Sequence, residues 1–195
     1  MKRLLISASF VAAAIIPSAA QAQAIPPAVI AVVDLDKVTA NCNACKAANA
    51  ALRSQLTAEQ NQEKALGTPL ETERNSIQAA VDALKGKDPD AALQARIKAF
   101  QTKGQEAQQE VERSRAQLQA NQAYIRKQIA DKLGPIYSQV MQRRGANVMV
   151  EIGTTLASGA NLDVSNDVLA ALNAALPSVS TTAPAPARTT QPQGR

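Results

Sequence analysis

The sequence predicts a mainly helical α+β protein, in which a small β body carries a long antiparallel helical hairpin, a coiled-coil arm. Three observations support this fold class. An apolar, β-branched run occupies residues 28–33, as expected of a buried strand, and residues 147–152 are a second strand candidate. The long segment between them is rich in Ala, Gln, Lys and Glu and repeats its apolar residues at coiled-coil spacing. The chain has no Trp and only 2 Phe and 2 Tyr, so the packed core must be small, because aromatic residues normally dominate core burial.

Residues 1–24 have the composition of a secretory signal peptide. Lys2 and Arg3 precede an apolar run that is too short to cross a bilayer. Two overlapping small-x-small sites follow it and predict cleavage after Ala22 or Ala24. We therefore expect the mature chain to lie outside the cytoplasm; the alternative is a segment kept as a membrane anchor.

The charge of the mature chain excludes one class of partner. Removal of the signal peptide leaves 19 basic and 16 acidic residues, and no cluster of basic and aromatic side chains that could stack on bases. We expect no nucleic-acid partner and at most weak contact with anionic lipid or acidic unfolded chains. Four basic residues of the arm either form a stripe that meets lipid or simply keep the surface soluble: Arg113, Arg115, Arg126 and Lys127.

The first strand is predicted over residues 28–33, which read Ala-Val-Ile-Ala-Val-Val. Apolar residues on both faces are typical of a strand that is buried on both sides. Pro26 and Pro27 prevent a helix from entering it, and the acidic residues 34–36 close it. Helical composition begins near Asn41.

The arm is predicted from two series of residues spaced alternately by four and three, the pattern of a coiled-coil seam. The first series is Leu52, Leu56, Glu59, Glu63, Leu66, Leu70, Glu73, Ile77, Ala80 and Leu84. The second series is Leu93, Ile97, Phe100, Gly104, Ala107, Val111, Ser114, Leu118, Asn121 and Ile125. The series stay in phase when the chain folds back on itself, from the Leu84–Leu93 pair to the Leu52–Ile125 pair. We therefore predict an antiparallel hairpin with an arm of roughly 60 Å.

The predicted seam is irregular. Several layers are polar, for example the one in which Leu56 faces Asn121, and they bury little apolar area. Pro69 predicts a break in the first helix, since proline removes a backbone hydrogen bond. The arm should therefore bend; the alternative is that one face packs on a partner and the irregularity is incidental.

The tip of the arm is predicted at residues 86–90. Gly86 should end the first helix, and Asp88 with Pro89 should start the second.

The second helix should continue past the arm until Gly145, with a kink at Gly134-Pro135 near the base of the hairpin. Strands are expected at residues 147–152 and 154–157. A final helix should cover residues 163–176, with Ser165 as its N-cap and Asp167 in its first turn. The Pro/Thr/Ala-rich tail, residues 177–195, has no apolar period and is predicted to be disordered.

Three blocks of sequence resemble the Skp/OmpH family of periplasmic chaperones. Residues 30–38 read Ile-Ala-Val-Val-Asp-Leu-Asp-Lys-Val, and residues 145–151 read Gly-Ala-Asn-Val-Met-Val-Glu. Residues 163–173 read Asp-Val-Ser-Asn-Asp-Val-Leu-Ala-Ala-Leu-Asn. The blocks bracket the arm and, together with its matching length, extend the resemblance over nearly the whole mature chain.

The resemblance implies a periplasmic homotrimer with a shared β-barrel body. Three arms would enclose a cavity that holds unfolded outer-membrane β-barrel proteins without ATP. The body would comprise residues 25–45 and 134–176, and the arm residues 46–133. Contacts between chains are expected from Ile30, Val32, Val33, Val148 and Val150. The resemblance implies no catalytic residue, cofactor or metal, and thus no enzyme.

Cys42-Asn43-Ala44-Cys45 is a feature that the family pattern does not lead us to expect. Helical spacing brings the two Cα atoms to about 5 Å, which permits a local disulfide, and an oxidising compartment favours one. The alternative is an exchanging redox pair, because a C-x-x-C at a helix N-terminus can have a lowered thiol pKa. The absence of His excludes Ser-His-Asp and Cys-His catalysis and His-based zinc sites.

Three functions remain open at this point. The first is a holdase chaperone for outer-membrane proteins. The second is a periplasmic coiled-coil adaptor with one fixed partner in an envelope complex. The third is a thiol-disulfide protein that uses Cys42 and Cys45.

Overall fold

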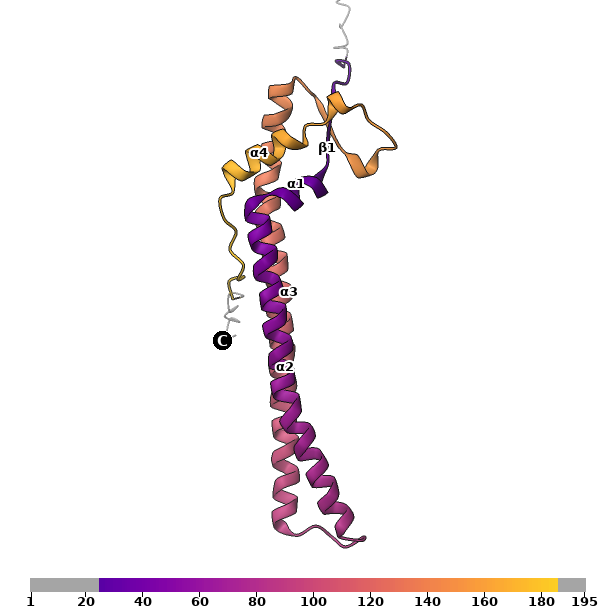
Figure 1. Ribbon diagram of the computed structural model, residues 1–195, viewed down its shortest axis with the longest axis vertical. Helices are drawn as coiled ribbons and strands as arrows, with labels where there is room; N and C mark the ends of the chain where they lie inside the picture. The colour runs from indigo at the N-terminus through magenta and orange to yellow at the C-terminus, as the bar shows by residue number, and fades with distance from the viewer. Residues whose placement is uncertain (1–24, 186–195) are drawn as a thin grey trace, which may run out of the picture.

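The computed structural model describes residues 25–185 and has a small body from which a long two-helix arm extends (Figure 1). The body contains strands β1 (Ile30–Val33) and β2 (Val148–Glu151), the short helix α1 (Leu35–Asn41) and helix α4 (Ser165–Ala175). The arm consists of α2 (Asn43–Ala83) and α3 (Ala91–Arg144). The predicted fold class, mainly helical α+β with a helical hairpin, is confirmed. The signal peptide predicted at residues 1–24 lies outside the described residues.

The sheet of the body has two parallel strands. Ile30 lies opposite Val148, and the register continues to Val33 opposite Glu151. The strands can run parallel because the whole arm serves as the crossover between them. The third strand predicted at 154–157 is wrong: a 3₁₀ turn, η1 (Ile152–Thr154), follows β2 directly, and the chain leaves the sheet there. A second 3₁₀ turn, η2 (Ala160–Leu162), precedes α4.

Helix α1 begins directly after β1, earlier than the sequence indicated. The side chain of Asp34 accepts a hydrogen bond from the Lys37 N–H (2.7 Å), so Asp34 is its N-cap. Val38 on this helix is completely buried. Helical structure therefore starts at Leu35 rather than near Asn41, because a short capped helix is stable when a buried valine packs it against the core.

The hydrophobic core lies where α1, the start of α2, the end of α3 and α4 meet. Val38, Cys42, Val140, Val168 and Leu172 have no exposed surface. Figure 1 shows α4 crossing α3 at this end of the molecule. The core thus lies at the body end of the molecule and is small, as the low aromatic content suggested.

The start of α4 differs from the prediction. Val164, not Ser165, is the N-cap residue, and Ser165 is the first helical residue. The Ser165 hydroxyl accepts from the Asp34 N–H (2.8 Å) and donates to Asp163, so it ties α4 to the end of β1. Hydrogen bonds from Ser165 hold the pKa of Asp163 below its usual value. Asp167 lies in the first turn as predicted and pairs with Arg144 (2.6 Å).

The two arm helices are continuous, which contradicts the break predicted at Pro69; α3 also runs without an end through Gly134-Pro135, where a kink is predicted. Both prolines lie inside helices, in α2 and α3 respectively. Both are also exposed, so water can satisfy the carbonyl that each proline leaves without a partner. Gly145 ends α3 in the left-handed conformation, with φ 66°, as predicted.

The predicted seam is confirmed at all but two positions. Every residue of the two series is buried or half-buried except Leu56 and Glu63. Leu56 is 43% exposed, because the neighbouring Gln55 takes its place and accepts a hydrogen bond from the Asn121 side chain (2.9 Å). The hydrogen-bonding capacity of the buried amide of Asn121 therefore decides which residue of α2 faces it.

The turn at the tip has its glycine where predicted and its capping residue two positions later. Gly86 has φ 87°, in the region that favours glycine, and follows the end of α2. Asp90, rather than Asp88 with Pro89, caps α3, and its side chain accepts from the Leu93 N–H (2.8 Å).

Candidate functional site

The arm changes character along its length. Buried residues of α2 and α3 occur only near the body, from Ala44 to Glu59 and from Asn121 to Val140. The segment between, residues 60–120, has no buried residue, and its seam positions remain partly open to solvent. In Figure 1 the two helices lie side by side near the body and separate toward the tip. The outer arm is therefore a pair of loosely packed helices with accessible apolar side chains.

Ion pairs across the hairpin replace apolar packing at two points of the outer arm. Glu73 pairs with Arg96 (2.6 Å), and this hydrogen bond lowers the pKa of Glu73. Arg115 bridges Glu63 (2.7 Å) and Glu59 (3.3 Å), whose hydrogen bonds raise the pKa of the guanidinium. Such exposed pairs contribute little stability, so they hold the helices in register without making them rigid.

The four residues of the proposed basic stripe do not form one cationic surface. Arg113 pairs with Glu110, Arg115 with the two glutamates just described, and Lys127 with Asp131 (2.6 Å). Arg126 lines a groove near the body. Their charges are largely balanced locally, which favours the interpretation that they keep the arm soluble.

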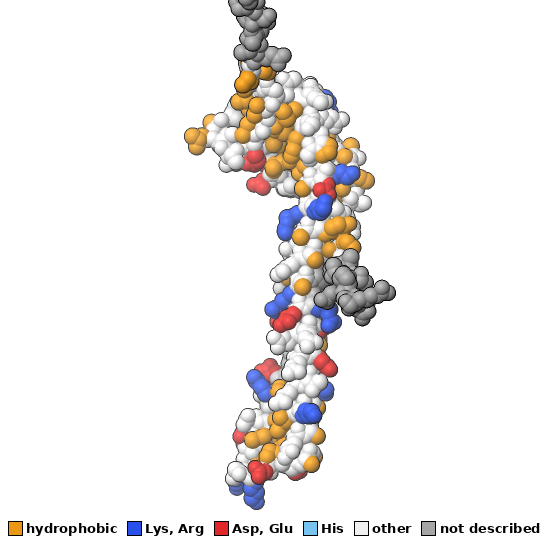
Figure 2. Space-filling model, turned by 180° about the vertical axis from the view of Figure 1, so that it is seen from behind, with side chains coloured by type: hydrophobic (Ala, Val, Ile, Leu, Met, Phe, Trp, Pro, Cys, Tyr) orange, Lys and Arg blue, Asp and Glu red, His pale blue; other side chains and the backbone are white. Residues whose placement is uncertain are grey.

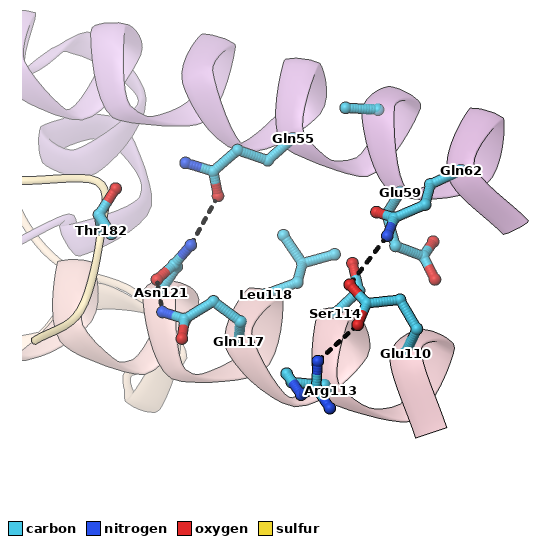
Figure 3. Close-up of a pocket in the computed structure, with 11 residues that line it drawn as sticks. Gln55, Glu59, Gln62, Glu110, Arg113, Ser114, Gln117, Leu118, Asn121 and Thr182 are labelled. Atoms are coloured by element: carbon cyan, nitrogen blue, oxygen red, sulfur yellow. Dashed lines mark hydrogen bonds and ion pairs between the residues drawn. The ribbon is translucent and has the colours of Figure 1, made fainter. Parts of the chain in front are cut away.

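Two grooves run along the part of the arm nearer the body. The first, which we call the tail groove, is the surface of α2 and α3 that carries Gln55, Asn121 and Gln128, and the tail covers part of it. Beside the tail a cavity of about 480 Å³ remains, and its lining includes Gln55, Glu59, Gln117, Asn121 and Thr182 (Figure 3). The second, which we call the open groove, has a volume of about 720 Å³ and a more apolar lining: Cys45, Leu52, Ile125, Ile129 and Leu133, with polar residues at the rim.

Part of the tail lies against the arm in the tail groove, which contradicts the predicted disorder for residues 178–183. Figure 1 shows the chain after α4 running along the base of the arm. Val179 packs against the core, and Ser180, Thr181 and Ala183 make hydrogen bonds to α2 and α3. The composition of the tail hides this contact, because the arm supplies the hydrogen-bonding side chains. Residues 186–195 lie outside the described part.

Sequence reasoning missed the polar side chains that hold the tail. Gln117, Asn121 and Gln128 are spaced by four and seven residues, so they lie on one face of α3. Asn121 is only 6% exposed. The available signal was an amide at a seam position with glutamines around it, which predicts a hydrogen-bonding partner inside the seam.

The five residues predicted to join the chains of a trimer fall into two groups. Ile30 and Val148 are partners in the sheet register and are 43% and 39% exposed. Val32 and Val33 are buried within this chain, and Val150 is half-buried beside Val32. Only the first group is therefore well exposed in this chain, and Val32 and Val33 are covered by the chain itself.

Ile30 and Val148, together with Val29, form what we call the body patch. Val29 is 47% exposed, and its carbonyl accepts a hydrogen bond from the Val148 N–H (3.2 Å). Leu156, on the loop after β2, is fully exposed. Figure 2 shows hydrophobic side chains gathered over the body and again near the tip of the arm. Three exposed apolar residues therefore lie together at the end of the two-stranded sheet.

Cys42 and Cys45 lie at the start of α2, in the core of the body. Their sulfur atoms are bonded, and their Cα atoms are 5.1 Å apart. Cys42 is the N-cap of α2, where its Sγ accepts from the Cys45 N–H (3.2 Å). Exposures of 0% and 3% leave little access for an exchanging thiol, which favours a structural role.

Replacing both cysteines should change function little. In the variant Cys42→Ser with Cys45→Ala, a serine hydroxyl can cap α2 as the sulfur does now. The bridge closes a loop of only a few residues, so its loss should cost little entropic stability. We expect a free energy of unfolding reduced by about 1–2 kcal/mol and unchanged suppression of aggregation of an unfolded client. Urea unfolding and light scattering check this; loss of activity at unchanged folding would instead indicate a redox role.

Within residues 25–185, no helix is long and apolar enough to cross a membrane, and no group of three or more metal-ligating side chains occurs.

Comparison with known proteins gives one family and one fold. Residues 29–172 match the family model described as outer membrane protein (OmpH-like). No curated protein matches the chain. Among solved structures, a candidate outer membrane chaperone (OmpH-like) from Caulobacter crescentus superimposes with a TM-score of 0.66 at 18% identity, covering 80% of this chain and 90% of that one. The family match spans most of the sequence and both arm helices, and the fold agrees: this chain belongs to the OmpH-like outer membrane protein family.

Proposed function

We propose that this protein is an ATP-independent periplasmic holdase chaperone that binds unfolded outer-membrane β-barrel proteins between its arms. The observation that carries the proposal is the absence of any buried residue over residues 60–120, all of which are described. A helical arm of this length without a fully buried core gains little from burial within the chain. Its accessible apolar side chains suit contact with another polypeptide.

The chemistry of an unfolded barrel protein fits such a surface. Its strands alternate apolar and polar residues, so they offer many small apolar contacts rather than one large anchor. Half-buried seam residues on two separable helices can meet many such contacts, each weak, and their sum gives useful avidity. Ion pairs such as Glu73–Arg96 keep the arm soluble while no client is bound.

The body patch supports the trimer in this proposal. One chain provides one arm, and a cavity needs at least one more. Ile30 and Val148 expose apolar area at the end of a two-stranded sheet, which neighbouring chains could cover by extending it. The arms, by contrast, bear the balanced charges expected of surfaces that remain in solvent.

The test is suppression of aggregation by the full-length chain. An outer-membrane β-barrel protein is diluted from urea with and without this protein, without nucleotide, and light scattering is followed. We expect nearly complete suppression once the proposed trimer equals the client, and a comparable effect on barrel proteins of unrelated sequence. Protection restricted to a single partner would favour the adaptor function, and no protection of any barrel protein would refute the chaperone function.

A further inference from the structure

The tail is held in its groove by side-chain amides that bind its backbone. The Gln128 side chain forms two hydrogen bonds with Ser180: its Nε2 donates to the Ser180 carbonyl (2.9 Å), and its Oε1 accepts from the Ser180 N–H (3.0 Å). The Ala183 N–H donates to Asn121 Oδ1 (2.8 Å). The Gln55 Nε2 donates to the carbonyl of Thr181 (3.0 Å). All four hydrogen bonds go to main-chain atoms of the tail.

A carboxamide has the same donor and acceptor as a peptide group, so Gln128 acts on the tail as a neighbouring strand would. Main-chain groups are the same in every sequence apart from proline. A groove that binds them selects an extended chain rather than particular side chains.

The amides of the groove also hydrogen-bond one another, which fixes their orientation. The Gln117 Nε2 donates to Asn121 Oδ1 (2.8 Å), and the Asn121 Nδ2 donates to Gln55 Oε1 (2.9 Å), as Figure 3 shows. Asn121 is 6% exposed, so its side chain has little freedom to turn. Fixed, partly desolvated amides bind a backbone more strongly than mobile ones, since less entropy is lost on binding.

We propose that the tail groove is a binding site for extended polypeptide backbone, that residues 180–183 occupy it as an internal ligand, and that client segments compete with them for it. The competition by client segments rests on the proposed function. A tethered tail acts at an effective concentration on the order of millimolar, so even weak affinity keeps the groove filled. A client that also contacts the arms can displace the tail. A short peptide lacks those contacts and cannot displace it.

The experiment frees the tail without shortening the chain. Ser180→Pro with Ala183→Pro removes the two tail N–H groups that donate to Gln128 and Asn121. Thr182→Pro is the matched control, because the Thr182 N–H makes no hydrogen bond to another described residue. The probe is a fluorescent peptide of residues 178–185, followed by anisotropy.

The variant with Ser180→Pro and Ala183→Pro, which we call the freed-tail protein, should bind the peptide about tenfold or more tightly than wild type or the control. Each lost hydrogen bond weakens binding of the protein's own tail to the groove by roughly fivefold, so the peptide meets less competition. A scrambled peptide should bind equally well. Adding Gln128→Ala to the freed-tail protein should lower peptide affinity by roughly tenfold, whereas Gln119→Ala, on an exposed position of the same helix, should not.

Equal peptide binding by freed-tail and wild-type protein, or binding unaffected by Gln128→Ala, would overturn the proposed site. Binding of the native peptide but not of the scrambled one would overturn recognition of the backbone. The freed-tail protein should also bind an unfolded barrel protein several-fold more tightly; unchanged client affinity would overturn the competition. Because wild type is tested for suppression of aggregation in parallel, a failure here leaves the proposed function standing if wild type still protects.

Discussion

Deletion of residues 67–107 should abolish protection of an unfolded barrel protein while leaving the body and its assembly intact. The deletion removes most of the arm that lacks buried residues, and with it most of the accessible seam. The stub retains the buried residues of both helices, including Glu59 and Asn121. It can be closed by a short Gly-rich turn after Leu66, because the hairpin pairs that end of α2 with α3 near Val111.

The measurement combines sedimentation with light scattering on a barrel protein diluted from urea. The shortened protein should sediment as the same oligomer as wild type, and should leave client aggregation close to that of client alone. The matched control keeps the arm length and replaces residues 85–90 of the tip by a Gly/Ser turn of equal length. This control should protect as wild type does. A shortened protein that protects fully would contradict binding by the arms and favour the adaptor function.

Ile30→Asp together with Val148→Asp should abolish assembly and convert the protein to monomers. The two residues are opposite each other on the sheet and 43% and 39% exposed, so in a single chain the new carboxylates can stay in water. In an assembly that covers the body patch, they would be buried without partners, at a cost of several kcal/mol for each charge. Protection of clients should fall with assembly, because one arm cannot enclose a client.

The control makes the same substitution at equal exposure elsewhere. Leu56 and Val81 on the arm are 43% and 37% exposed, so Leu56→Asp with Val81→Asp adds the same charge away from the body. This variant should remain assembled in sedimentation velocity, and circular dichroism should show that both variants are folded. If the body-patch variant stays assembled, the chains meet elsewhere. Val32 and Val33 would be unsuitable positions, because both are buried within the chain and an aspartate there would unfold the body.

The sequence by itself predicted the features that depend on repeated or local patterns. The seam of the hairpin follows from spacing that recurs over many turns, so a single exception such as Leu56 does not disturb it. The end of α3 at Gly145 follows from one residue that accepts a left-handed conformation. The first strand and the terminal helix were placed because each combines an apolar pattern with flanking signals.

Only the tertiary structure decided the features that depend on contacts between distant segments or on which side of a helix faces solvent. Helix α1 is a single capped stretch whose stability comes from burying Val38 against distant elements, so its composition alone does not reveal it. Pro69 and Pro135 lie within continuous helices because each happens to face solvent.

The tail is the clearest case of this second kind. Its composition is that of a disordered segment, and Ser180 and Ala183 have no apolar pattern to place them. Their hydrogen-bonding partners, Gln128 and Asn121, lie more than fifty residues earlier in the sequence. Periodicity reports which residues of one helix face inward, but it carries no information about which distant backbone a buried amide will bind. That pairing exists only once α2, α3 and the end of α4 have been brought together, because α2 and α3 form the groove and the end of α4 places the tail beside it.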